Sequence, residues 1–104
     1  MSDLQKVASL SDIPVGQVKA VEFDGEQVVI CNVAGSLYAV SDICSHDYAL
    51  LSEGELTGNE ISCPRHGARF DVKTGKALCL PAVVPVETYK VEVKDGDVYV
   101  STNS

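Results

Sequence analysis

Apolar and polar residues alternate along much of the chain with a period of two, which is the spacing of a half-buried β-strand. The alternation predicts a first strand over residues 18–23, and an apolar run predicts a second over residues 27–33; a third strand follows over residues 36–41. Asp24-Gly25 separates the first two strands, and such a pair is a strong signal for a two-residue hairpin turn. Ala34-Gly35 separates the second strand from the third. The first part of the chain is therefore predicted to form an antiparallel meander.

The end of the chain carries the clearest β signal. Apolar and charged residues alternate over residues 91–94, Asp95-Gly96 provides a turn, and residues 98–100 return with β-branched and aromatic side chains. No stretch sustains an apolar spacing of ~3.6 residues. Pro14 limits any helix near residues 9–15 to a short turn. We therefore expect an all-β protein.

Residues 42–85, between the two β blocks, have a different character. The region is rich in Gly and Pro, and its predicted strands are short, at residues 60–63 and 69–72, with a turn at 73–76. Both histidines of the chain lie in it. It is expected to be a small metal-binding insertion carried by a β framework.

Each histidine sits beside a cysteine. Cys44 and His46 form a Cys-x-His motif, and Cys63 and His66 form a Cys-x-x-His motif. Thiolate and imidazole are the ligands that soft and borderline metals prefer. A lone histidine is usually an ordinary surface or core residue, but two such pairs are improbable by chance. The four residues therefore indicate a metal site.

The spacing of the ligands leaves two kinds of metal centre open. Two cysteines and two histidines can bind one zinc ion in a structural module. In an extended chain, residues i and i+2 stand roughly 6.5–7 Å apart, which is too far for two ligands of one metal at bonds of about 2.0–2.3 Å. A folded loop can bring the ligands together, so zinc stays an alternative. A centre with two metals suits the spacing more naturally.

The two motifs resemble those of the Rieske family, in which they bind a 2Fe-2S cluster. The resemblance implies that Cys44 and Cys63 ligate the buried iron, and that His46 and His66 ligate the outer iron. It also implies that the cofactor is one Rieske-type 2Fe-2S cluster and that the protein carries single electrons.

The resemblance extends beyond the ligands. Further matching positions follow the second motif: Gly67, Arg69-Phe70-Asp71, Thr74-Gly75-Lys76 and Pro81. The family pattern implies a single Rieske domain over residues 1–104. Its cluster-binding subdomain would span about residues 42–81, and its β base, an antiparallel sandwich or incomplete barrel, would combine residues 1–41 and 82–104.

The sequence departs from the branch of the family found in cytochrome bc complexes. That branch has an extra cysteine in each loop, joined as a disulfide, where this chain has Ala49 and Arg65. It also places serine and tyrosine hydroxyls near the cluster, where this chain has Ala68 and Phe70. Hydrogen bonds to the sulfur atoms favour the reduced cluster. Their absence predicts a low-potential centre, like those of bacterial ring-hydroxylating dioxygenase systems.

The two remaining cysteines have no predicted role. Cys31 lies in an apolar run, and Cys79 lies between two leucines. Both are interpreted as small buried apolar side chains rather than as a disulfide, because nothing in the sequence indicates export to an oxidising compartment.

The chain is acidic, with 8 Lys and Arg against 15 Asp and Glu and a formal charge of −7. This balance argues against nucleic acid as a partner. It suits docking to a basic patch on a protein, although it can also serve solubility alone. No apolar run matches a signal peptide or a membrane-spanning helix, so we expect no membrane partner and a cytoplasmic location.

These features together predict a monomeric electron carrier rather than an enzyme, because no histidine remains to build the mononuclear iron site of an oxygenase. The protein would receive an electron from a flavoprotein ferredoxin reductase and pass it to a terminal oxygenase of the aromatic-ring dioxygenase type. A Rieske ferredoxin that serves an iron–sulfur assembly system or another reductase is one alternative. A zinc-bound structural or interaction module is the alternative from a different class.

Overall fold

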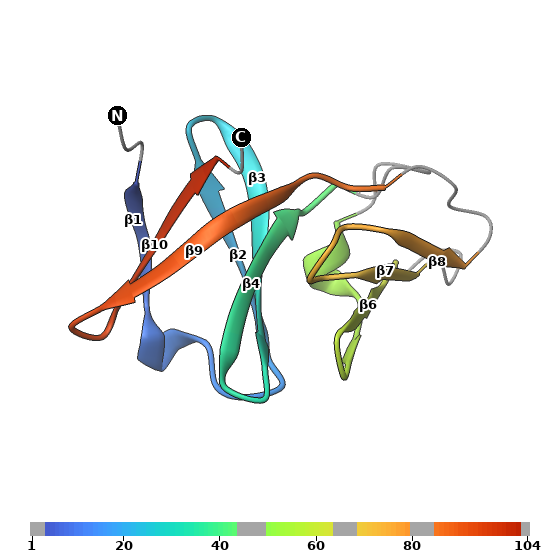
Figure 1. Ribbon diagram of the computed structural model, residues 1–104, viewed down its shortest axis with the longest axis horizontal. Coiled ribbons are helices and arrows are strands. Elements are labelled where there is room, and N and C mark those ends of the chain that lie inside the picture. Colours follow the sequence, from blue (N-terminus) through green and yellow to red (C-terminus); the bar gives the residue numbers. More distant parts are fainter. Residues whose placement is uncertain (1–3, 44–49, 64–68, 80–84, 103–104) are drawn as a thin grey trace.

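The computed structural model describes residues 4–43, 50–63, 69–79 and 85–102, which form two antiparallel sheets (Figure 1). The strands within these ranges are β1 (Gln5–Ser9), β2 (Val18–Phe23), β3 (Glu26–Val33), β4 (Ser36–Ser41), β5 (Leu56–Thr57), β6 (Glu60–Ser62), β7 (Arg69–Asp71), β8 (Ala77–Cys79), β9 (Thr88–Lys94) and β10 (Asp97–Thr102). Two short 3-10 helices accompany them, η1 (Leu10–Asp12) and η2 (Leu51–Glu53). The prediction of an all-β protein is confirmed.

The larger sheet has six strands in the order β1-β10-β9-β4-β3-β2, and all of its pairings are antiparallel. The predicted meander forms β2 to β4, and the predicted C-terminal hairpin forms β9 and β10. Pairing of β9 with β4 joins these two units. The outermost strands, β1 and β2, also contact each other, so the sheet is a nearly closed barrel. This matches the expected β base.

The predicted hairpin turns have the backbone that two-residue turns require. Asp24, Ala34 and Asp95 each precede a glycine and have φ angles of 51°, 52° and 52°. Positive φ at the first turn residue matches the twist of the flanking strands and keeps the hairpin in register. These turns fix which residues of β2, β3 and β4 face the inside of the barrel.

The smaller sheet has four strands in the order β5-β6-β7-β8 and lies beside the barrel (Figure 1). Its two central strands are the two that the sequence predicts, each one residue shorter than expected. Its outer strands, β5 and β8, have only two and three residues. This sheet falls within the Gly- and Pro-rich region of the chain.

Two hydrophobic cores hold the molecule together. The barrel core lies inside the six-stranded sheet; its buried members are Ala8, Ile13, Phe23, Val28, Ile30, Ala39, Val98 and Val100. The inter-sheet core lies between the two sheets; its buried members are Val29, Cys31, Val40, Leu51, Ile61, Cys63, Phe70, Val72 and Val86. Successive residues of β3 belong alternately to the two cores, because neighbouring side chains of a strand point to opposite faces. Strand β3 is therefore the wall that both cores share.

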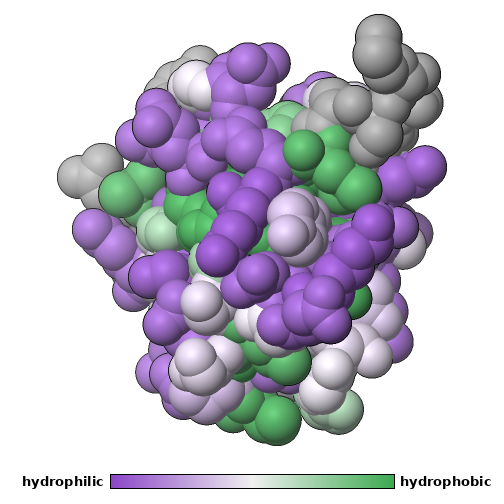
Figure 2. All heavy atoms as spheres, turned by 90° about the vertical axis from the view of Figure 1, so that its left-hand side faces the viewer, coloured by the Kyte–Doolittle hydropathy of each residue, from purple (hydrophilic) through white to green (hydrophobic). Residues whose placement is uncertain are grey.

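The side of the barrel away from the small sheet is mainly hydrophilic, with hydrophobic residues in separate patches (Figure 2). Among the residues that the structure describes, no helix has the length and apolar character needed to cross a membrane. The short helix predicted near residues 9–15 is η1.

Candidate metal centre

Cys63 is the one predicted ligand that lies within the described residues. It directly follows β6, and only 2% of its surface is exposed. Its side chain belongs to the inter-sheet core, together with Leu51 and Phe70. An apolar shell of this kind limits the access of water to a bound metal group and tunes its redox potential. The position of Cys63 therefore fits a ligand of a buried iron.

Three strand ends meet on the side of the small sheet where Cys63 lies. Ser62, the last residue of β6, pairs with Arg69, the first residue of β7. Arg69 also pairs with Cys79, the last residue of β8. The residues on either side of positions 64–68, Cys63 and Arg69, thus both lie at this end of the sheet, and Cys79 lies there as well.

The residues on either side of positions 44–49, which carry the first motif, are also bonded to each other. Ile43 and Leu50 form an isolated antiparallel bridge. The backbone N–H of Leu51 donates to the carbonyl oxygen of Asp42 at 2.7 Å. These contacts bring the two ends of the segment together before η2 begins.

The carboxyl group of Asp42 adds further hydrogen bonds between the two flanks of this segment. Its Oδ1 accepts a hydrogen bond from the Ser52 N–H at 2.6 Å, and its Oδ2 accepts one from the Ser52 hydroxyl at 2.8 Å. Asp42 is 2% exposed and Ser52 is half-buried, so both bonds are partly buried. Burial raises the pKa of Asp42, and the negative charge of Glu53 adds to this rise, while the hydrogen bonds from Ser52 oppose it.

The stretch after η2 contacts the second ligand-bearing segment. A Cβ on Gly54 would collide with the carbonyl oxygen of Ser62, so the two backbones approach as closely as only glycine permits. Ser62 N–H donates to the carbonyl oxygen of Glu55 at 2.9 Å, and Glu55 N–H donates to the Ser62 hydroxyl at 3.2 Å. Ser62 directly precedes Cys63, so these bonds link the two ligand-bearing segments.

The other predicted site residues lie outside the described part of the chain: Cys44, His46, Ala49, Arg65, His66, Ala68 and Pro81. Within the described part, no group of three or more metal-ligating side chains occurs. The structure therefore places the flanks of both ligand-bearing segments and one thiol of the predicted set.

Cys31 is a free, fully buried thiol, as the sequence predicts. Burial raises its pKa to about 12, and the nearby negative charge of Asp42 adds to this rise. The thiol therefore stays protonated at neutral pH, which makes it a poor ligand and a poor nucleophile. Cys79 is the last residue of β8, and its side chain is not among those that the structure describes.

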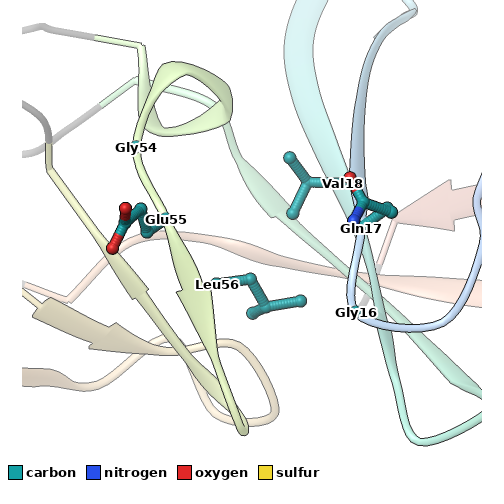
Figure 3. Close-up of a pocket in the computed structure, with 6 residues that line it drawn as sticks. All are labelled: Gly16, Gln17, Val18, Gly54, Glu55 and Leu56. Atoms are coloured by element: carbon teal, nitrogen blue, oxygen red, sulfur yellow. The ribbon is translucent and has the colours of Figure 1, made fainter.

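A cavity of about 260 Å³ lies elsewhere, between the turn before β2 and the stretch that enters β5 (Figure 3). Leu56 points toward Val18 across this space, and Glu55 points away from it (Figure 3). Cys63 does not line the cavity. This cavity is therefore a gap between the two sheets rather than the metal site.

The described residues define an all-β domain in which a small sheet holds the buried thiol of Cys63, one member of the two Cys-His motifs of the sequence. The donor set that the sequence predicts, two thiols and two imidazoles, fits a Rieske-type cluster, in which two histidines replace two of the four cysteines of other 2Fe-2S sites. Residues 3–90 match the model of the Rieske [2Fe-2S] domain family. The chain belongs to this family, and its cofactor is one Rieske-type 2Fe-2S cluster rather than a zinc ion.

Relatives of similar length are ferredoxin components of dioxygenase systems. The chain is 44% identical over 88 residues to the ferredoxin component of naphthalene 1,2-dioxygenase/salicylate 5-hydroxylase systems from Ralstonia sp, covering 85% of each chain. It superimposes on the ferredoxin of carbazole 1,9a-dioxygenase from Nocardioides aromaticivorans IC177 with a TM-score of 0.93 and 38% identity, covering 98% of this chain and 100% of that one. The resemblance to Rieske ferredoxins of dioxygenase systems is confirmed.

A third relative was solved together with a partner. The chain matches a complex of reduced oxygenase and oxidized ferredoxin in carbazole 1,9a-dioxygenase, with a TM-score of 0.90 and 39% identity. The match covers 97% of this chain and 94% of that one. In that complex, a ferredoxin similar to this chain is bound to an oxygenase.

Sequence reasoning missed the hydrogen bonds between Asp42 and Ser52, which lie on either side of the first motif. Asp42 marks the boundary of the insertion in the sequence, and Ser52 lies ten residues later with no motif around it. The only signal is a carboxyl residue two positions before Cys44, at the end of an apolar strand. That signal does not identify the hydrogen-bond partner, which is set by the path of the chain after the first motif.

Proposed function

We propose that this protein is a soluble, low-potential Rieske ferredoxin that carries single electrons from a flavoprotein reductase to a terminal oxygenase of the ring-hydroxylating type. The observation that carries the proposal is the burial of Cys63 in a chain of the Rieske family whose sequence contains two Cys-His motifs. Its relatives over most of their length are ferredoxin components of dioxygenase systems.

The proposed ligands are Cys44 and Cys63 for the inner iron and His46 and His66 for the outer iron. The bound cluster would supply one-electron redox chemistry. Neutral imidazoles in place of two thiolates leave less negative charge at the site, which favours electron uptake. The histidines would also place a conjugated edge toward a docking partner. The cluster-binding part is proposed to span about residues 42–81 of a single domain, with residues 1–41 and 82–104 as the base.

Side chains around the site support a low potential. Phe70 is fully buried in the inter-sheet core with Cys63 and has no hydroxyl group. Ala68 likewise offers none. Without hydroxyl donors to the sulfur atoms, the reduced and more negative cluster gains less stabilisation.

The acidic surface supports a protein partner with a basic docking patch. The formal charge of −7 gives long-range attraction to such a patch and raises the rate of encounter at low salt. The proposed reductase and oxygenase would both offer basic surfaces near their redox centres. A cytoplasmic location and a monomeric state are part of this proposal.

The ligand set is tested with single variants of the purified holoprotein. Wild type should be red-brown, contain two irons per chain and give a reduced-state EPR signal of mixed nitrogen and sulfur ligation. Cys63→Ser and Cys44→Ser should lose the cluster, and His66→Cys should lower the potential or lose the cluster. Cys31→Ala is the matched control and should keep it. A colourless protein with stoichiometric zinc would overturn the assignment.

The partners are tested by reconstitution. The reduced protein should be reoxidised by a ring-hydroxylating terminal oxygenase in the presence of its aromatic substrate and oxygen. A flavoprotein reductase with NADH should then reduce it again. If the oxygenase leaves the reduced protein unchanged but a reductase of another pathway exchanges electrons with it, the dioxygenase assignment is wrong although the cluster assignment stands.

A further inference from the structure

Asp42 is a buried carboxyl residue whose hydrogen bonds reach across the first ligand-bearing segment. Its side chain accepts two hydrogen bonds from Ser52, at 2.6 and 2.8 Å. Its carbonyl oxygen accepts the N–H of Leu51, and its own N–H donates to Gln27 of β3 at 2.9 Å. The residue is thus anchored to the barrel on one side and to η2 on the other.

A buried carboxyl group is costly unless its oxygens are satisfied. Here each oxygen has a partner, and both partners belong to one residue that lies beyond the segment carrying Cys44 and His46. Hydrogen bonds to a carboxylate are shorter and stronger than those between neutral groups. The pair therefore fixes the end of β4, where the chain leaves the barrel, relative to η2.

The contacts continue to the second motif. Ser52 lies in η2, and the residues directly after η2 contact Ser62 through the Gly54 backbone and the hydrogen bonds of Glu55. Ser62 precedes Cys63. A continuous set of short contacts thus runs from Asp42 through η2 to the buried cysteine.

We propose that Asp42 is a positioning residue for the cluster: through Ser52 and η2, it sets the spacing between the first and second ligand-bearing segments. This inference rests on the proposed function. Ligands of a metal site are held by partners outside the coordination sphere, and loosening these partners weakens the geometry and the affinity of the site.

Three variants of the holoprotein test this role. Asp42→Ala removes both side-chain hydrogen bonds, and Ser52→Ala removes only the one from the hydroxyl. Asp42→Asn keeps the geometry, because its amide oxygen accepts from the Ser52 N–H and its amide N–H donates to the Ser52 hydroxyl. The measurements are the line shape of the reduced-state EPR spectrum and the rate at which a chelator bleaches the cluster.

Asp42→Ala should broaden the EPR lines and bleach about tenfold faster, since a lost buried hydrogen bond to a charged group is worth a factor of that order. Ser52→Ala should change both readouts in the same direction by a smaller factor. Asp42→Asn should restore the wild-type line shape. If Asp42→Ala does not fold, Ser52→Ala decides, and a wild-type result for it overturns the proposal.

Asp71 provides a matched control. Its carboxylate also accepts two hydrogen bonds, from the Lys73 N–H at 2.8 Å and from the Asn59 side chain at 3.2 Å. It lies at the other end of β7, away from the strand ends beside Cys63. Asp71→Ala should lower the free energy of unfolding and leave the EPR line shape unchanged.

Three further results would overturn the positioning role. The first is a native line shape and bleaching rate in Asp42→Ala, and the second is equal broadening in Asp71→Ala. The third is failure of Asp42→Asn to restore the spectrum. A wild-type protein without a mixed-ligand EPR signal would instead refute the proposed function. The two failures are therefore distinguishable.

Discussion

The two phenylalanines of the chain are both buried, but they lie in different cores. Phe70 is fully buried in the inter-sheet core beside Cys63. Phe23 is 3% exposed in the barrel core, where its ring meets Tyr89 edge-on at 5.8 Å between centroids. Both rings contribute apolar burial, but Phe70 shares its core with Cys63, the one proposed ligand within the described residues, and Phe23 does not. The same added hydroxyl should therefore have different effects at the two sites.

Phe70→Tyr is predicted to raise the reduction potential of the cluster. A hydroxyl at this position would donate toward a sulfur atom of the site, which favours the reduced form. Phe23→Tyr is the matched control: its hydroxyl enters the other core and should cost roughly 1–3 kcal/mol of stability if unpaired, with no change in potential. An EPR-monitored redox titration and urea unfolding measure the two effects. An unchanged potential in Phe70→Tyr would refute the hydroxyl argument.

At the scale of elements, the turn between β7 and β8 is fastened to the stretch that enters β9. Gly75 has φ of +79°, and a Cβ there would collide with the carbonyl oxygen of Val86 and meet the Thr88 side chain at 3.0 Å. Val86 N–H donates to the Gly75 carbonyl oxygen at 2.8 Å. This contact holds the small sheet against the strand that returns the chain to the barrel.

Gly75→Ala is predicted to destabilise the holoprotein far more than Gly58→Ala. Gly58 also has a positive φ, +61°, but a Cβ there meets no atom within 4 Å. Both substitutions carry the backbone penalty of roughly 1 kcal/mol for alanine in this conformation. Gly75→Ala must in addition displace the Val86 backbone, for a further loss of about 2 kcal/mol or more. Urea unfolding compares the two, and equal losses would show that the contact is unimportant.

The elements that the sequence predicted are those whose signals are local. Asp-Gly pairs and alternating residues predicted the strands of the meander and of the C-terminal hairpin, with strand ends that differ from the observed ones by a few residues at most. The missed strands depend on distant pairing. Gln5–Ser9 pairs with β10 at the other end of the chain, and Leu56–Thr57 and Ala77–Cys79 are too short to show a period.

In the candidate site, too, local features were predicted from the sequence and long-range contacts were not. Motif spacing identified the four proposed ligands, because the ligand types and their separations are local properties of the sequence. The contact between Asp42 and Ser52 depends on how the chain folds back after the first motif. Side-chain partners of this kind have no sequence period and are found only in three dimensions.

At the scale of the whole molecule, the two cores have different relations to the cluster. The barrel core is built from a continuous hydrogen-bonded sheet, and none of its members among the described residues is a proposed ligand. The inter-sheet core contains Cys63 and depends on strands of three residues or fewer on the small-sheet side. Short strands bury little surface by themselves. The small sheet should therefore rely on the bound cluster more than the barrel does.

Removal of the cluster is predicted to loosen the small sheet and leave the barrel folded. A group that binds only the native state stabilises the structure that forms its site. In the apoprotein, backbone amides of Ile61 and Phe70 should exchange hydrogen at least about tenfold faster than in the holoprotein, while those of Val98 and Val100 should change little. Residue-resolved hydrogen exchange before and after chelation measures this. Equal acceleration in both sheets would mean that the shared wall of β3 couples the two cores into one cooperative unit.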